Sequence, residues 1–318
     1  MVSRIGSFAN QQLILDATLR TQSQLAETRL QAATGKKSQI FSGIAQDSSR
    51  LVNLKNEVAK ADQYIENIAT TEKRLTLMNL SLETIDEIAR EMRSITVNSL
   101  NGEAADTNNL TEVATQFLEQ TVELLNQRDD SRYLFAGGKT DTKPVDLANG
   151  VYTAPVPPPF DAVVDTGYYE GDSTTQQVRI DDGVTIQYGI TADQSAFEKV
   201  IRALDNIAQT TFSVPITPAE KQVLNDAITL LTEATENNGA QKTIGGFAAD
   251  VALDLRTIDI QKDRHTEFIN FATNSIADIE NVDTAETLSL LNFQQVQLEA
   301  SFQIVARLGQ LSLSNFLR

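Results

Sequence analysis

The last long stretch of the chain, Leu288–Phe316, reads LSLLNFQQVQLEASFQIVARLGQLSLSNF. Leu291, Leu298 and Val305 recur every seven residues, and Phe302 lies four residues after Leu298. Apolar residues at this spacing form a stripe along one side of a helix, with the period of a coiled coil. No proline interrupts the stretch. It therefore predicts a long helix with one apolar seam.

The beginning of the chain carries a matching pattern. Steps of three and four residues separate Ile5, Phe8, Gln12, Leu15 and Leu19, and the stripe continues through the next helical turns. Since neither terminal helix has enough of a body around it to bury its seam, we predict that the two pack against each other and against copies of themselves. The predicted assembly seam consists of Ile5, Phe8, Leu15, Leu19, Leu291, Leu298, Phe302, Val305, Leu308, Leu311 and Phe316.

The charge of the chain is unevenly distributed. Its formal net charge is −17, which argues against binding to nucleic acid or to an anionic membrane surface. Residues 1–40 carry five basic and two acidic side chains, and residues 285–318 carry two of each. The acidity therefore belongs to the middle of the chain. The nearly uncharged ends favour close packing in an assembly over solvation.

Several classes of site and location are excluded by composition. The chain has no cysteine, so disulfides and thiolate chemistry are ruled out. No apolar run approaches the roughly 20 residues that cross a bilayer, and the first residues lack the apolar core of a secretory signal. We expect no membrane insertion, and a protein that either stays in the cytoplasm or leaves the cell without a cleaved signal peptide.

The prolines divide the chain into regions. All seven lie between residues 144 and 218, and consecutive prolines exclude a central strand. We predict a mainly α fold: a long antiparallel helical rod with paired terminal coiled-coil helices and a small β-rich insert domain. The predicted regions are 1–40 with 285–318 for assembly, 41–137 with 194–284 for the rod, and 138–193 for an outward-facing insert.

Local signals place the individual elements. Apolar spacing predicts helices over 3–33, 47–100 and 244–279, and Asp-Gly at 182–183 predicts a hairpin turn between two strands. The segment 151–164 predicts an edge strand or an extended loop. Helix starts are predicted where a capping residue precedes an acid by three positions: Asn109 with Glu112, Ser195 with Glu198, Thr217 with Glu220, and Asp283 with Glu286.

Signals for chemistry are weak. Residues 136–140, AGGKT, resemble the end of a phosphate loop, but Tyr133 stands where that motif needs a glycine. The pairs Asp129-Asp130 and Asp181-Asp182 are expected to be solvated rather than to bind a cation. The lone His265 is either a polar layer that fixes helix register or a partly exposed side chain, and we favour the exposed interpretation. We expect no enzyme, no metal and no cofactor.

Three segments carry a resemblance to a known family. They are ETRLQAATGKK at Glu27–Lys37, RYLFAGGKTDTKPV at Arg132–Val145, and the final helix from Asp283 to Leu317. In this order they resemble the bacterial flagellin family, and within it the hook-associated junction proteins. One feature departs from the family pattern: residues 45–49, AQDSS, hold a single aspartate where many members have an Asp-Asp pair.

The resemblance implies a mechanical function outside the cell. The terminal helices would form the inner coiled-coil layer of a tube, and a ring of subunits would join the flagellar hook to the filament and template flagellin assembly. It implies as partners copies of the chain, the preceding hook-associated junction protein, flagellin and an export chaperone, with type III export. Flagellin itself is the nearest alternative. A cytoplasmic coiled-coil adaptor and an enzyme with a pocket in the insert also stay open.

Overall fold

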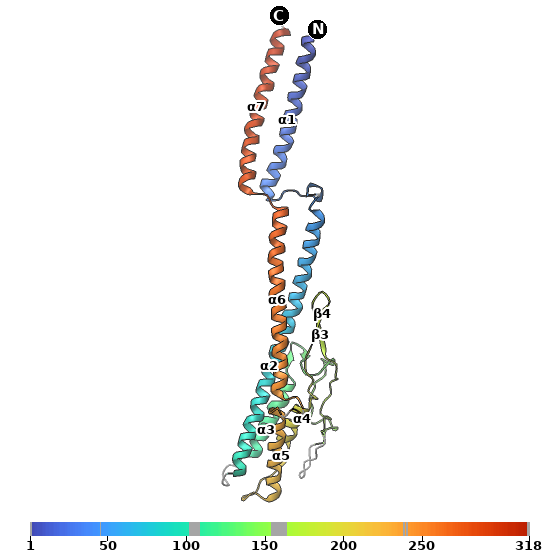
Figure 1. Ribbon diagram of the computed structural model, residues 1–318, viewed down its shortest axis with the longest axis vertical. Helices are drawn as coiled ribbons and strands as arrows, with labels where there is room; N and C mark the ends of the chain where they lie inside the picture. The colour runs from blue at the N-terminus through green and yellow to red at the C-terminus, as the bar shows by residue number, and fades with distance from the viewer. Residues whose placement is uncertain are drawn as a thin grey trace. The chain divides into compact units, whose positions relative to one another are not determined.

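The computed structural model describes residues 2–44, 46–101, 109–153, 164–237, 239 and 241–316 (Figure 1). Side chains are described between residues 12 and 307 of these ranges, except at 41 and 42. The helices are α1 (Val2–Thr34), α2 (Ser48–Asn101), α3 (Leu110–Leu125), α4 (Ser195–Gln209), α5 (Pro218–Thr235), α6 (Ile244–Glu280) and α7 (Thr284–Phe316), with a 3-10 turn at Phe41–Ile44. The strands are β1 (Arg128–Asp129), β2 (Arg132–Tyr133), β3 (Gln176–Asp181) and β4 (Val184–Tyr188). The predicted fold class, mainly α with a small β-rich insert, is confirmed.

The chain forms two compact units. One, the terminal unit, comprises Met1–Lys60 and Glu267–Arg318; the other, the body unit, is Ala61–Thr266. The terminal unit contains α1, α7 and the adjoining ends of α2 and α6. The body unit contains the rest of those two helices, α3 to α5 and the insert. The predicted division into three regions stays a prediction.

The body unit has a continuous hydrophobic core. The long helix α2 contains neither proline nor glycine, and its apolar residues recur at helical spacing. Leu82 and Ile85 of α2 are fully buried, as are Phe197 and Leu204 of α4. The ring of Phe197 lies edge-on to Phe135 of the insert at 6.2 Å. Helices and insert therefore share one core.

The insert contains two short antiparallel hairpins. The predicted hairpin β3–β4 is confirmed, and Gly183 in its turn has φ 75°, which glycine adopts at little cost. The hairpin β1–β2 was not predicted; Asp130 in its turn has φ 55°. Residues 154–163 of the predicted edge strand or loop lie outside the described residues.

At two of the predicted helix starts the capping side chain is confirmed. At Thr217 the side chain accepts from the Glu220 amide at 3.3 Å, while the Glu220 carboxylate accepts from the Thr217 amide at 2.7 Å. The Thr217 amide, with the nearby Ser213, holds the pKa of Glu220 below its ordinary value. At α7, Asp283 Oδ1 accepts from the amides of Ala285 and Glu286 at 2.8 and 3.1 Å. Both carboxylates therefore satisfy amides that a helix start leaves unpaired.

At the two other predicted starts the helix begins at or within one residue of the predicted place, but the capping box is absent. Asn109 has φ −106° and ψ −3°, and its side chain makes no cap hydrogen bond; a capping side chain usually needs an extended backbone. Ser195 is already helical, and its hydroxyl donates to Gln241 Oε1 at 2.9 Å. Glu198 is buried and pairs with Arg202 at 3.1 Å.

Candidate assembly surface

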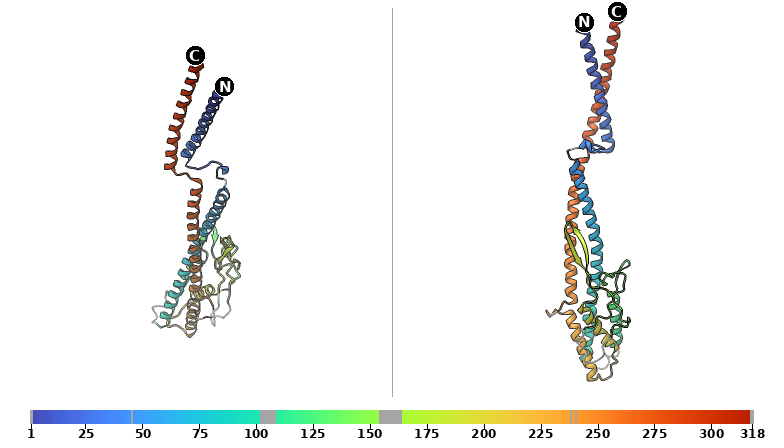
Figure 2. Two further views of the ribbon diagram at one scale, coloured as in Figure 1. Left: turned by 45° about the horizontal axis from the view of Figure 1, so that its top comes forward. Right: turned by 90° about the vertical axis from the view of Figure 1, so that its right-hand side faces the viewer.

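Helices α1 and α7 lie side by side in the terminal unit (Figures 1 and 2). At their common end, Gly35 with φ 70° terminates α1. The Val282 amide then donates to the Gly35 carbonyl at 2.9 Å, and the Lys37 amide donates to the Glu280 carbonyl at 2.7 Å. Because the C-terminus of α1 meets the N-terminus of α7, the two helices run antiparallel.

Charge pairs reinforce the same end. The Glu280 carboxylate accepts from Lys36 Nζ at 3.0 Å and also from Lys55. The hydrogen bond from Lys55, followed by the one from Lys36, holds the pKa of Glu280 below its ordinary value. This carboxylate therefore connects the segment after α1 with the start of α2 and the end of α6.

The seam between α1 and α7 is largely polar in composition. On α1 the buried side chains are those of Thr18, Thr21, Leu25 and Thr28; on α7 they are Thr287 and Gln294. They follow steps of three and four residues, as a helix face requires. In α1, however, this seam lies one residue before the predicted stripe, which ran through Leu15 and Leu19.

The buried threonines keep their hydroxyls satisfied within their own helix. Thr18, Thr21 and Thr28 donate to the carbonyl four residues earlier, at 2.8, 3.0 and 2.9 Å. Thr287 does the same to Asp283 at 2.6 Å. With the hydroxyl engaged along the helix, we infer that the threonine methyl groups supply the contact between α1 and α7.

The predicted seam residues occupy different positions. Leu15 and Leu19 are 54% and 55% exposed, and Phe302 and Val305 are 48% and 38% exposed. Leu291 and Leu298 are half-buried in the seam. Leu15 and Leu19 do not face α7 within one chain, because α1 turns their side chains about 100° away from the seam; their packing in an assembly of copies stays a prediction. The side chains of Ile5, Phe8, Leu308, Leu311 and Phe316 lie outside those described.

A groove of about 490 Å³ runs along one flank of the pair. Its lining residues are Gln24, Glu27, Thr28 and Gln31 of α1, with Leu290, Phe293, Gln294 and Gln297 of α7. Gln294 Oε1 has no hydrogen-bond partner among the described residues. The pair also exposes many large apolar side chains: Leu13, Leu15, Leu19, Leu30, Leu288, Leu290, Phe293, Val296, Phe302, Ile304 and Val305. So large an apolar exposure on a monomer marks an interaction surface.

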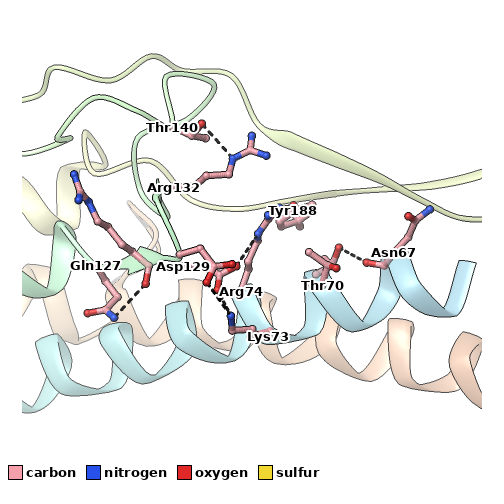
Figure 3. Close-up of polar contacts among 12 residues, drawn as sticks. Asn67, Thr70, Lys73, Arg74, Gln127, Asp129, Arg132, Thr140 and Tyr188 are labelled. Carbon is pink, nitrogen blue, oxygen red and sulfur yellow. Dashed lines mark hydrogen bonds and ion pairs between the residues drawn. The ribbon is translucent and has the colours of Figure 1, made fainter. Parts of the chain in front are cut away.

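Asp129 joins the β1–β2 hairpin to α2 (Figure 3). Asp129 is buried, and it contacts Lys73 Nζ at 2.5 Å and Arg74 Nε at 3.2 Å. The hydrogen bond from Lys73 holds the pKa of Asp129 below its ordinary value, against its burial. Asp130 is exposed as predicted. The expectation that both acids are solvated is wrong for Asp129.

The phosphate-loop-like residues 136–140 form a tight turn against a carboxylate. Gly138 N donates to Asp172 Oδ1 at 2.6 Å. A Cβ on Gly137 would lie 2.1 Å from the Asp172 carbonyl oxygen. The glycines thus allow close packing, and the carboxylate takes the amide that an anionic ligand would need.

His265 is buried, so the exposed interpretation is wrong. Its Nε2 lies 2.7 Å from the Ile180 carbonyl oxygen, and its ring centroid lies 5.3 Å from that of Tyr64. Asn67 of α2 also donates to β3, at the Arg179 carbonyl, at 3.3 Å. His265 of α6 therefore contacts Tyr64 of α2 and fastens the β3–β4 hairpin to the helices; a role in fixing helix register stays a prediction.

Within the part of the chain that is described, no group of three or more histidine, aspartate or glutamate side chains is arranged to hold a metal ion. No described helix combines the length and the hydropathy of a membrane span.

Known structures share this fold. The chain is similar to a protein described as a flagellar hook-associated protein from Vibrio parahaemolyticus, with 19% identity and TM-score 0.59 over 75% of this chain and 100% of that one. It is similar to FlgL from Bacillus cereus, with 17% identity and TM-score 0.56 over 71% and 99%. It is also similar to the flagellar hook-associated protein 3 from Legionella pneumophila, with 12% identity and TM-score 0.53 over 71% and 98%.

At these identities the similarity establishes the fold. No protein-family model matches the sequence, and no curated protein matches it.

Proposed function

We propose that this chain is a structural subunit of the bacterial flagellum, equivalent to hook-associated protein 3 at the junction between hook and filament. The observation that carries the proposal is the α1–α7 pair, whose buried side chains are mainly threonine and glutamine, with Leu25, while most of its large apolar residues are exposed. The proposal is supported by the fold, which the chain shares with flagellar hook-associated proteins, and by the three sequence segments that resemble that family.

The exposed apolar residues supply the driving force of the proposed assembly. Burying one leucine or phenylalanine side chain contributes about 1.5–3 kcal/mol. Several such residues on each α1–α7 pair give a ring of copies enough stabilisation to offset the loss of freedom on association. The body unit has its own buried core, so it acts as a preformed support for these helices.

The proposed partners follow from the position of such a ring. One side contacts the preceding hook-associated junction protein, and the other templates flagellin. Before assembly, an export chaperone covers the apolar surface of α7 and the type III apparatus exports the chain without a cleaved signal peptide. The role is mechanical, outside the cell, with no catalysis, cofactor, nucleic acid or membrane insertion.

Deletion of the gene tests the proposal. Flagellin is weighed on the cells and in the medium, and the cells are inspected for hooks by electron microscopy. Hooks without filaments, together with intact flagellin shed into the medium, support a junction protein. Hooks without filaments and no flagellin in either fraction identify this chain as flagellin itself. Normal filaments contradict both functions.

A further inference from the structure

The two flanks of the α1–α7 pair carry different residues. One is the groove flank, lined by Gln24, Glu27 and Gln31 of α1 and by Leu290, Phe293 and Gln297 of α7. Because residues of an α-helix follow one another at about 100°, Leu13 and Ile304 extend this flank towards the free end. The same rotation defines a second surface, the opposite flank. It carries Leu15, Leu19, Gln22, Ala26 and Arg29 of α1, with Leu288, Gln295 and Phe302 of α7.

The antiparallel pairing determines which residues of α1 and α7 lie at the same height along the axis of the pair. Lys36 lies opposite Asn281, and the residues that line the groove continue the same correspondence towards the free end. Counting along both helices from this point places Leu13 near the height of Ile304, and Leu15 near the height of Phe302. At 1.5 Å per residue, these two levels differ by about 3 Å.

At equal heights the two flanks match in chemistry. Towards the free end, the groove flank presents Leu13 and Ile304, which are 68% and 50% exposed. The opposite flank presents Leu15 and Phe302 at the same level, both about half exposed. The apolar patch on one flank is therefore available to cover the matching patch on the other flank of a second copy.

The correspondence continues towards the base of the pair. The groove flank carries Gln24 and Gln297 where the opposite flank carries Gln22 and Gln295. Lower still, Glu27 on the groove flank stands within two residues of Arg29 on the opposite flank. Both charges are exposed, and residues two apart in a helix do not face each other, so neither neutralises the other within one chain.

We infer that the groove flank of one subunit packs against the opposite flank of a second copy at the same height. The inference rests on the proposed assembly of copies and names its contact. Such a contact joins two different surfaces, so each subunit keeps one flank free for the next, and the contacts close into a ring or continue as a helix.

Charge disfavours the symmetric alternatives. In a parallel pair of subunits, groove flank against groove flank sets Glu27 against Glu27, and opposite flank against opposite flank sets Arg29 against Arg29. Juxtaposed like charges oppose association. The mixed contact sets Glu27 against Arg29 instead.

Cysteine cross-linking tests the contact directly, since the chain has no cysteine of its own. Full-length variants Leu13→Cys, Leu15→Cys and the double variant are expressed in the deletion strain, and cells with assembled filaments are oxidised. The double variant is expected to give a ladder of linked subunits, while each single variant stays monomeric. Within one chain the two cysteines are two residues apart on one helix and point to opposite flanks, so they do not form a disulfide.

Each other pattern overturns the inference. Dimers from either single variant mean a symmetric contact, and no ladder from the double variant in cells that retain filaments means that these flanks do not meet. Filament retention tests the proposed junction function separately. If the deletion strain keeps its filaments without any copy of the gene, the proposed function is contradicted, whichever cross-links the variants form.

A charge exchange gives a second test. Glu27→Arg and Arg29→Glu each place like charges together and are expected to lower filament retention by tenfold or more. The double variant restores the opposite-charge pair with its signs exchanged and is expected to recover most of the loss. A double variant no better than the single variants overturns the Glu27–Arg29 contact.

Discussion

The body unit and the terminal helix pair bury opposite kinds of side chain. In the body unit, Leu82, Ile85 and Phe197 are fully buried. In the terminal pair, Thr21 and Gln294 are buried while Leu15 and Phe302 stand about half exposed. A folded chain normally places its large apolar residues inside. The body unit follows that rule within one chain, whereas the terminal pair does not; in the proposed assembly, neighbouring copies would cover its exposed apolar residues.

This difference separates folding from association. The seam between α1 and α7 buries mainly threonine and glutamine and leaves most of the large apolar side chains of the pair exposed. Helices with so little buried apolar surface are marginal alone in water. Substitutions in the two regions should therefore affect different measurements, and the following experiments test that separation.

The largest effect is expected from charges introduced on α7. Leu298→Asp together with Val305→Asp should abolish assembly, because the seam and its continuation would then bury carboxylates without partners. The body unit should stay folded, since its core contains neither residue. Sedimentation or filament counts measure assembly, and circular dichroism with limited proteolysis measures the body.

A matched control adds the same charge elsewhere on α7. Asn292→Asp with Gln303→Asp places two carboxylates on the exposed side away from α1, and should leave assembly intact. If the body unit unfolds with Leu298→Asp and Val305→Asp, the two units are not independent and the comparison fails.

The next largest effect is expected from replacing a buried phenylalanine by alanine, compared with the same replacement at an exposed phenylalanine. Phe197 is fully buried and stacks on Phe247 at 5.9 Å, so Phe197→Ala should lower the free energy of unfolding by about 3–5 kcal/mol. Phe302→Ala makes the same chemical change at an exposed position, and should change the stability of the monomer by less than about 0.5 kcal/mol. Urea unfolding of dilute protein measures both. Equal losses would show that Phe302 is part of a core within one chain.

The sequence predicted the long helices well because their signals repeat. The apolar spacing in α2 and α6 extends over many turns, so single exceptions do not obscure it. The β3–β4 turn depends on one glycine with φ 75°, and such a glycine is visible in the sequence. Helix starts were less predictable. Ser195 has the capping spacing, but its partner Glu198 pairs with Arg202 in the folded chain.

The assembly surface was only partly predictable, for a physical reason. Reading Leu15 and Leu19 as the seam assumes that the most apolar stripe faces the nearest helix. The seam instead uses Thr18, Thr21 and Thr28, whose hydroxyls bond to their own helix. Asp129 and His265 were misjudged because their partners, Lys73 and the Ile180 carbonyl, lie far from them in the sequence.

A moderate and pH-dependent effect is expected at Asp129. Its pKa is lowered in the folded chain, so its stabilising contribution is fully present above the unfolded value of about 3.8 and is lost as the pH falls through the folded value. Asp129→Asn should therefore cost about 1–3 kcal/mol at neutral pH, and the difference from the natural chain should shrink in acid. Urea midpoints measured from pH 7 down to about pH 3 test this.

The neighbouring acid provides the control for that experiment. Asp130 is exposed and lies in the same turn, and asparagine tolerates its positive φ. Asp130→Asn should change stability by less than about 0.5 kcal/mol at any pH. A constant difference between Asp129→Asn and the natural chain across the pH range would mean that the Lys73 and Arg74 contacts do not stabilise the fold.

The smallest effect is a gain in stability, at Gln294 in the seam. Its side chain is buried, and Oε1 has no hydrogen-bond partner among the described residues. A buried polar atom without a partner costs about 1–3 kcal/mol, so Gln294→Leu should stabilise the α1–α7 pair by about 1 kcal/mol. That gain corresponds to a roughly fivefold slowing of amide hydrogen exchange, confined to α1 and α7.

Gln297→Leu is the matched control, because Gln297 lines the groove and is exposed. It adds the same apolar side chain outside the seam, so exchange in α1 and α7 of the monomer should stay unchanged. If both variants slow exchange equally, the helix pair gains from any added leucine, and its weakness would not come from the polar seam. If only Gln294→Leu does so, the terminal pair is weak because of what it buries, and its exposed leucines remain available for neighbouring subunits.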